Sequence, residues 1–229
     1  MLQLSKGILI AIEGIDGSGK STLAHNLSLC LHKEGYDTLL TKEPGSSELG
    51  KEIRKIIHTQ TIPLTQSAEY LLFAADRAQH FTELVIPALE QKKLIISDRM
   101  SDSSLAYQGY GNGLELEMIN VINKWTMKNI VPDITIFVRI PVEIALERAK
   151  KRGSLSAYEQ RTDFLYRVAH GFEELYKNRN DVIIVNGIES AENLTFQICK
   201  ALKEWIPLAS KNLLQHNCGL DNINKPLPK

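Results

Sequence analysis

Short apolar runs alternate along this chain with longer segments of helical periodicity, and no other feature restricts the fold as strongly. The runs are continuous, which is typical of strands that are covered on both faces. When a helix separates two strands, they form a parallel sheet, because the helix carries the chain back to the same edge. The predicted strands are 8–12, 37–41, 94–97, 135–138 and 182–185. The sequence therefore predicts an α/β fold with three layers, in which helices flank a five-stranded parallel sheet.

The segments between these strands carry apolar residues at helical spacing. Leu23, Leu27 and Leu31 form one stripe, and Gly35 stands where a helix commonly ends. Further helices are predicted at 49–57, 65–91, 114–129, 142–149 and 194–205. The second of these is expected to break near Pro87, since proline lacks the N–H that a helix interior needs.

Two stretches lack a clear period. Residues 150–161 are polar and basic and contain Gly153, which suits a short lid over a phosphate site. Residues 207–229 hold prolines and asparagines, so a loosely structured tail is expected there. Residues 1–206 are predicted to form a single domain.

Charge and composition exclude several classes of protein. The sequence has 27 Lys+Arg and 27 Asp+Glu residues, so it lacks the basic excess of a protein that binds nucleic acid or an anionic membrane. The apolar run at 8–12 is far shorter than the roughly 20 residues of a membrane-spanning helix. With no signal-peptide pattern before it, a cytoplasmic protein is expected.

The cysteines, Cys30, Cys199 and Cys218, are widely spaced and form no C-x-x-C pair. This spacing predicts neither a disulfide framework nor a zinc site, which fits a reducing cytosol. Cys30 and Cys199 are expected to be small core residues on helices.

The first predicted strand runs into a glycine-rich segment that matches the phosphate-binding pattern G-x-x-x-x-G-K-[ST]. Glycines let the backbone wrap an anion, so that N–H groups and the next helix N-terminus face it. Lys20 is expected to reach the β- and γ-phosphates, and the Ser21 hydroxyl to bind Mg²⁺. The predicted ATP-binding residues are Gly14, Ile15, Asp16, Gly17, Ser18, Gly19, Lys20, Ser21 and Thr22.

Residues that follow the other strands should lie beside this loop, because ligands of parallel α/β sheets bind beyond the carboxyl ends of the strands. Glu43 follows the second strand, and Asp98 and Arg99 follow the third. Asp98 is predicted to hold Mg²⁺ with Ser21, through water or directly. A GTPase would need an Asn-Lys-x-Asp motif, which neither 123–126 nor 224–227 provides, so a small-molecule kinase is favoured.

Four blocks of the sequence are similar to one family of phosphate-loop kinases. They are 13–22; 43–45 with Gly50 and 53–54; 72–80, which reads LFAADRAQH; and 98–99 with 103–104 and 106–109. On these blocks the chain resembles the thymidylate kinase family of P-loop nucleoside monophosphate kinases. The resemblance implies transfer of the γ-phosphoryl group of ATP to dTMP, with Mg²⁺ as cofactor and a homodimer as the assembly.

Phe73 and Arg77 are four residues apart and therefore share one helix face. A ring there can stack on a base, and a guanidinium at the base edge can donate to thymine O4. By resemblance, Tyr107 lies against the deoxyribose and Gln108 reaches the base.

The resemblance also assigns the remaining contacts. Arg54 and Arg99 are implied to bind the acceptor 5′-phosphate, Asp16 its 3′-hydroxyl or the metal–water shell, and Glu43 to orient arginines. The full dTMP-binding set implied is Asp16, Glu43, Arg54, Phe73, Arg77, Arg99, Ser104, Tyr107 and Gln108.

Catalysis is expected to come from positive charge. Some members of the family place an arginine where this chain has Gly17, so the lid region must supply that charge here. The predicted catalytic residues are Lys20, Arg99, Arg148 and Arg152, with Lys150, Lys151 and Arg161 as alternatives.

Three positions depart from the family pattern: Ser46 in the turn after Glu43, Met100 after Arg99, and Arg139 at the end of the fourth strand. Two other functions stay open. One is a related kinase for another pyrimidine nucleotide or a deoxynucleoside, and the other is a nucleotide-operated binding module with little catalysis. Acceptor-dependent release of ADP would separate them.

Overall fold

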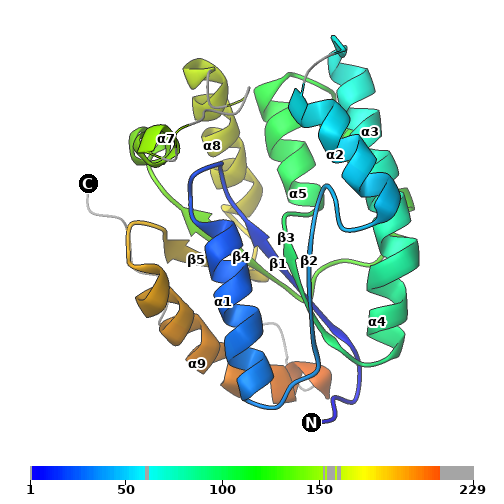
Figure 1. Cartoon of the computed structure of the whole chain (residues 1–229), viewed down its shortest axis with the longest axis vertical. Helices are drawn as coiled ribbons and strands as arrows, with labels where there is room; N and C mark the ends of the chain where they lie inside the picture. Colours follow the sequence, from blue (N-terminus) through cyan, green and yellow to red (C-terminus); the bar gives the residue numbers. More distant parts are fainter. Residues whose placement is uncertain (1, 60–61, 152, 154–157, 159–160, 212–229) are drawn as a thin grey trace.

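The computed structural model describes residues 2–59, 62–151, 153, 158 and 161–211. At its centre is a five-stranded parallel sheet with the order β2-β3-β1-β4-β5 (Figure 1). The strands are β1 Ile8–Glu13, β2 Thr38–Lys42, β3 Leu94–Asp98, β4 Ile134–Arg139 and β5 Val182–Asn186. Each predicted strand is confirmed to within one residue at either end, since a continuous apolar run marks a covered strand.

The described helices flank this sheet. They are α1 Lys20–Lys33, α2 Glu48–Thr59, α3 Gln66–His80, α4 Ile86–Glu90, α5 Ser101–Ser104, α6 Leu116–Thr126, α7 Val142–Lys151, α8 Thr162–Tyr176 and α9 Ala191–Ser210, with π-helical segments η1 Phe81–Val85 and η2 Leu105–Gly111.

The alternation of side chains along β1 explains the layers. Ile8, Ile10 and Ile12 are fully buried in a cluster with residues of α1 and α9. Leu9 and Ala11 point the other way and pack with residues of η1. Because successive side chains of a strand face opposite sides, the central strand buries a separate helical layer on each face. The predicted three-layer architecture is confirmed.

The predicted break near Pro87 is wrong. α3, η1 and α4 follow one another without a gap, and Pro87 lies in the first turn of α4. In η1 the Ile86 N–H bonds to the Phe81 carbonyl, one residue further back than in an α-helix. This wider turn changes the bonding register just before the proline, and a proline in a first turn leaves no interior bond unmade.

Two helical segments are absent from the predicted elements: α8 and the run α5–η2. In α8, Phe164, Val168 and Phe172 stand at helical spacing and are buried, so a signal for this helix was present. The run α5–η2 is short and π-helical, so it shows no 3.6-residue period. The two segments pack closely, since a Cβ on Gly111 would lie 2.5 Å from the Phe164 ring.

The expectation that the cysteines form no disulfide is wrong for two of them. Cys30 on α1 and Cys199 on α9 are joined by a disulfide across a sequence separation of 169. Both lie on helices, as predicted, and Cys199 is buried. Spacing along the chain could not reveal this pair, because it depends on α1 and α9 packing side by side (Figure 1).

The last helix continues past the domain boundary expected at 206. α9 runs through Pro207 to Ser210, whose carbonyl accepts a hydrogen bond from Ser5 Oγ at 2.8 Å. The tail from 212 onward and most of the expected lid, including Arg152, lie outside the described residues. No helix within the described ranges is long and apolar enough to cross a membrane.

Candidate active site

The glycine-rich loop connects β1 to α1 and packs closely against α7. Gly17 and Gly19 have φ angles of 79° and 98°, in the left-handed region that favours glycine. A Cβ on Gly17 would lie 2.5 Å from the Ala145 carbonyl oxygen, so the loop and α7 could not approach this closely with a larger residue. Among the described residues no side chain caps α1 at Gly19, which leaves its first N–H groups to an anion.

Lys20 is held inside this loop. Its side chain is 5% exposed, and Nζ donates a hydrogen bond of 2.8 Å to the Ile15 carbonyl. Burial lowers the pKa of Lys20 to about 8, because removing an ammonium from water penalises its charged form. A bound polyanion would restore the full charge, so the residue is suited to contact phosphate.

Ser21 and Asp98 meet at the carboxyl ends of β1 and β3. Ser21 Oγ donates to Asp98 Oδ2 at 2.5 Å, and Asp98 Oδ1 is buried with no hydrogen-bond partner among the described residues. An unpartnered carboxylate oxygen beside a hydroxyl suits a hard cation, which prefers oxygen ligands. The residues predicted for Mg²⁺ therefore fit such an ion.

Arg99 joins the phosphate loop to the segment after β3. Its φ of 73° is unusual for a residue other than glycine. The guanidinium donates to the Gly14 carbonyl at 3.1 Å and to Ser103 Oγ at 2.9 Å, and it forms an ion pair with Asp16. Burial alone would raise the pKa of Asp16, but the charges of Arg99 and Lys20 outweigh it and lower that pKa. Asp16 is thus held ionised.

Glu13, at the end of β1, binds the segment that directly follows Arg99. Its carboxylate accepts hydrogen bonds from the Met100 N–H at 2.8 Å, the Ser103 N–H at 3.2 Å and Ser103 Oγ at 2.5 Å. Burial raises the pKa of Glu13 to about 7. No site role is predicted for Glu13, although an acidic residue that ends a fully apolar strand was a readable signal.

Arg77 lies on α3, facing the carboxyl ends of the strands, and is 2% exposed. Nε donates to Glu43 at 2.8 Å, Nη1 to Asn123 at 2.6 Å, and Nη2 to Ser104 Oγ at 3.0 Å and the Met100 carbonyl at 3.2 Å. A guanidinium has five N–H donors, so these bonds leave at most one for a ligand. Its position is fixed before any ligand arrives.

The turn after β2 is held by α3. Glu43 accepts from Arg77 and from His80, and Asp76 Oδ1 accepts from the Gly45 N–H at 3.1 Å. Burial would raise the pKa of Glu43, but the Arg77 charge lowers it. Ser46 Oγ bonds both the N–H and the carbonyl of Lys42, so the serine that departs from the family pattern closes the same turn.

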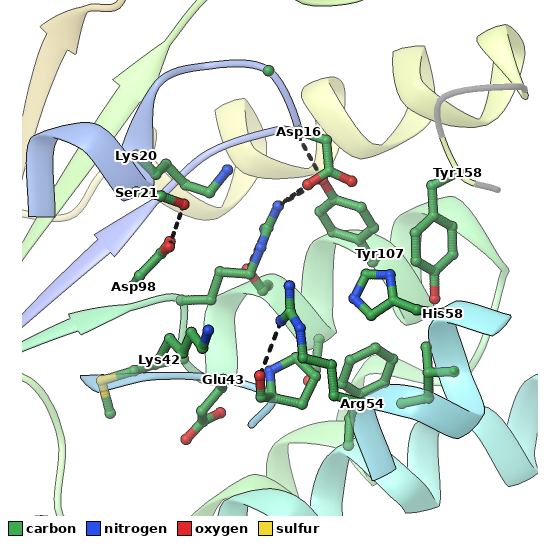
Figure 2. A pocket seen from close by; sticks show the side chains of 18 of the residues that line it. Asp16, Lys20, Ser21, Lys42, Glu43, Arg54, His58, Asp98, Tyr107 and Tyr158 are labelled. Atoms are coloured by element: carbon green, nitrogen blue, oxygen red, sulfur yellow. Dashed lines mark hydrogen bonds and ion pairs between the residues drawn. The ribbon is translucent and has the colours of Figure 1, made fainter. Parts of the chain in front are cut away.

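One cavity of about 520 Å³ is lined by most of these charged and polar side chains, but not by Glu13, Ser46, Asp76, His80 or Asn123. Figure 2 shows Lys20, Ser21 and Asp98 on one side of it, and Arg54, His58 and Tyr158 on the other. The predicted site residues that line it are Asp16, Gly17, Gly19, Lys20, Ser21, Thr22, Glu43, Arg54, Phe73, Arg77, Asp98, Arg99, Ser104, Tyr107, Gln108 and Arg148.

Some predicted residues do not line the cavity. Gly14, Ile15 and Ser18 are in the loop but behind its surface, with Ile15 packed in the core. Lys150 and Lys151 are exposed on α7. The Arg161 guanidinium lies over the Phe164 ring at 4.5 Å, away from the lining.

Other residues line the cavity without having been predicted. Lys42 ends β2, Ser103 lies in α5, His58 lies in the last turn of α2, and Tyr158 belongs to the expected lid. The position of Lys42 at a strand end was a usable signal. His58 and Tyr158 reach the cavity through the packing of distant segments, which no local pattern shows.

The chain is similar to known proteins over most of its length. A family model described as thymidylate kinase matches residues 12–198. The chain is 40% identical to the thymidylate kinase of Halothermothrix orenii over 203 residues, covering 86% of this chain and 97% of that protein. It is 39% identical to a probable thymidylate kinase of Pyrococcus horikoshii, covering 86% and 97% of the two chains.

A solved structure agrees. The crystal structure of thymidylate kinase from Ehrlichia chaffeensis superposes with a TM-score of 0.72 at 30% identity, covering 86% of this chain and 98% of that chain. The residues matched by the family model include the phosphate loop, α3 and the segment after β3. This chain belongs to the thymidylate kinase family and has the P-loop kinase fold.

Proposed function

We propose that this chain transfers the γ-phosphoryl group of ATP to the 5′-phosphate of dTMP, giving dTDP and ADP. The observation that carries the proposal is one continuous cavity, with the phosphate loop at one end and the Phe73–Arg77 face of α3 at the other. A kinase of this class must hold two nucleotides so that their phosphates meet in line. Lys20 and Arg99 line the space between those ends.

The donor end is suited to the triphosphate. The free N–H groups of the loop and the α1 N-terminus cradle its oxygens, and Lys20 contributes the charge. Ser21 and the unpartnered Oδ1 of Asp98 would hold Mg²⁺, with water completing its shell. When bound, Mg²⁺ neutralises charge on the β- and γ-phosphates.

The acceptor end is suited to a pyrimidine monophosphate. Arg54 and Arg99 bind the 5′-phosphate, and Phe73 stacks on the base. The Tyr107 hydroxyl accepts the Asp16 N–H at 2.9 Å, which holds the ring against the deoxyribose. The remaining N–H of Arg77 donates to thymine O4. Glu43 and Ser104 act as positioning residues, since both bind Arg77.

The transfer itself depends on alignment and positive charge. Arg148 extends from α7 over the loop, where its Nη1 is 3.4 Å from the Ser18 carbonyl. With Lys20 and Arg99, it lowers the repulsion between two polyanions as they approach. An acceptor phosphate is already ionised at neutral pH, so no strong general base is required. Arg152 stays a second candidate for the same role.

The test is ADP release measured with dTMP, dUMP, UMP, dCMP and thymidine in turn. The proposal expects the highest kcat/KM with dTMP and release that depends on Mg²⁺. Preference for thymidine or another monophosphate would favour the related-kinase alternative. Nucleotide binding without acceptor-dependent ADP release would favour a binding module.

A second copy of this chain is the proposed partner. Leu71 on α3 and Val121 and Trp125 on α6 are 56%, 63% and 71% exposed, and these two helices pack together. Val121 and Trp125 are four residues apart and so share one face of α6, and exposed apolar side chains that gather in this way favour an interface. Light scattering is expected to show a dimer for the unaltered protein and a monomer for Trp125→Arg.

We also propose a cytoplasmic location. The reaction consumes ATP and dTMP, and these nucleotides are held in the cell interior.

A further inference from the structure

Glu69 continues the α3 face that carries Phe73 and Arg77. The three residues are spaced by four, so their side chains lie in a row along the helix. Phe73 and Arg77 line the cavity, whereas Glu69 is half-buried behind its wall. A carboxylate in this row therefore acts on the cavity through other residues.

Two cavity residues donate to this carboxylate. Glu69 Oε1 accepts from Tyr158 Oη at 2.6 Å and from Gln108 Nε2 at 3.3 Å. Gln108 lies in η2 and is 2% exposed, so its amide is confined. Burial and the charge of Glu69 raise the pKa of Tyr158 well above its ordinary value, so that hydroxyl keeps its proton and donates.

An ionised carboxylate accepts hydrogen bonds and has no proton to donate. The Gln108 amide must therefore turn its NH₂ group toward Glu69. The carbonyl oxygen Oε1 of Gln108 then points away from Glu69. Without the carboxylate, an amide can rotate by half a turn and offer either a donor or an acceptor.

We propose that Glu69 is a positioning residue that sets base selectivity by fixing the orientation of the Gln108 amide. The inference rests on the proposed function, because the base is that of the acceptor nucleotide. With Oε1 turned to the base, Gln108 accepts from N3–H of thymine or uracil. It meets N3 of cytosine with two acceptors facing each other, and this unpaired contact disfavours dCMP.

The test replaces Glu69 by a residue of the same shape that can donate. In Glu69→Gln the new amide can bind Gln108 Oε1, so that Gln108 can turn its NH₂ group to the base. We expect KM for dTMP to rise about 10-fold with kcat little changed, and dCMP to be used no worse, so that selectivity falls about 10-fold. Glu69→Ala, which removes the acceptor altogether, should change selectivity in the same direction.

A matched pair elsewhere supplies the control. Gln79 donates to Glu83 on the exposed side of the same continuous helix, outside the cavity. Glu83→Gln breaks an amide–carboxylate pair of the same chemistry. It should leave KM for dTMP, selectivity and the melting temperature at the values of the unaltered protein.

Two outcomes would overturn the inference. One is unchanged selectivity between dTMP and dCMP in both Glu69 variants. If activity then falls equally with both acceptors, Glu69 is merely structural. The other is an equal change of selectivity in Glu83→Gln. If the unaltered protein fails to phosphorylate dTMP, the proposed function itself is refuted, which is a separate result.

Discussion

At the scale of single residues, the cavity is built from buried charges that pair with one another. Glu43 bonds Arg77 with almost no exposure to solvent, and Asp16 bonds Arg99 with side chains that are 27% and 17% exposed. A buried charge without a partner costs several kcal/mol, so these pairs hold the guanidinium groups in place before ligands bind. Lys20 has only a backbone carbonyl as hydrogen-bond acceptor among the described contacts. Under the proposed function, a phosphate oxygen would give the Lys20 ammonium group a charged hydrogen-bond acceptor.

Lys20→Ala is expected to lower kcat by several orders of magnitude, because it removes charge from the transferring phosphate. The melting temperature should stay the same or rise, since a partly desolvated ammonium is removed. Steady-state ADP release and thermal unfolding check both points. Lys33→Ala, an exposed lysine on the same helix, is the control. Near-normal turnover in Lys20→Ala would refute the role.

Glu13 gives the stability a defined pH dependence. Its pKa rises from 4.5 to about 7 on folding, so the folded state binds this proton more tightly than the unfolded state. Glu13 contributes at most about 3 kcal/mol to the free energy of unfolding. This contribution is fully present below pH 4.5 and is lost as the pH rises to about 7. Glu13→Gln cannot titrate. Urea unfolding at pH 5 and pH 8 should show a smaller decline in the variant, and equal declines would contradict this.

At the scale of elements, the acceptor side depends on close contact between α2, α3 and the turn after β2. Gly50 on α2 makes that contact possible, since a Cβ there would lie 2.1 Å from Asp76 Oδ1 and 3.2 Å from Gly45 Cα. Arg54, one turn further along α2, donates to the Pro44 carbonyl at 3.0 Å. Displacing α2 would therefore displace the arginine that we propose binds the acceptor phosphate.

Gly50→Ala is expected to destabilise the protein by about 1–3 kcal/mol, although alanine in a helix is otherwise favoured by about 1 kcal/mol. KM for dTMP should rise more than KM for ATP, because α2 lies at the acceptor end. Urea unfolding and steady-state kinetics measure both. Leu49→Ala, at the neighbouring exposed position, should change neither KM. A more stable Gly50→Ala protein would show that α2 can shift without cost.

At the scale of the whole molecule, the first and last helices of the fold are tied together. Cys30 and Cys199 link α1 and α9 on one face of the sheet, while the cavity lies beyond the carboxyl ends of the strands. The link closes a loop that contains most of the chain. A cytoplasmic location would favour the reduced form of this pair, so its redox state bears on where the protein works.

Reduction of the disulfide is expected to lower the free energy of unfolding by about 2–5 kcal/mol, because the unfolded chain gains freedom. Thermal unfolding with and without dithiothreitol measures the change, and Cys199→Ser should resemble the reduced protein. ADP release should change little at temperatures where both forms are folded. An unchanged melting temperature after complete reduction would contradict the expectation.

Sequence patterns predicted the features that depend on residues close to one another in the chain. The strands follow from continuous apolar runs, the phosphate loop from glycine and lysine spacing, and the shared face of Phe73 and Arg77 from helical geometry. α8 had a comparable signal in its buried stripe. η1 shows the limit of such patterns, since one wider turn let the helix pass Pro87.

The sequence alone determined the sheet, its helical layers and the chemical types of residue at its carboxyl edge. Only the tertiary structure decided their partners: Glu43 and Asn123 around Arg77, the Met100–Ser103 segment above Glu13, Cys30 with Cys199, and Glu69 with Gln108. Each pair joins segments that are far apart in the chain. A local period arises from bonds between near neighbours, whereas these contacts arise from the packing of whole elements against one sheet.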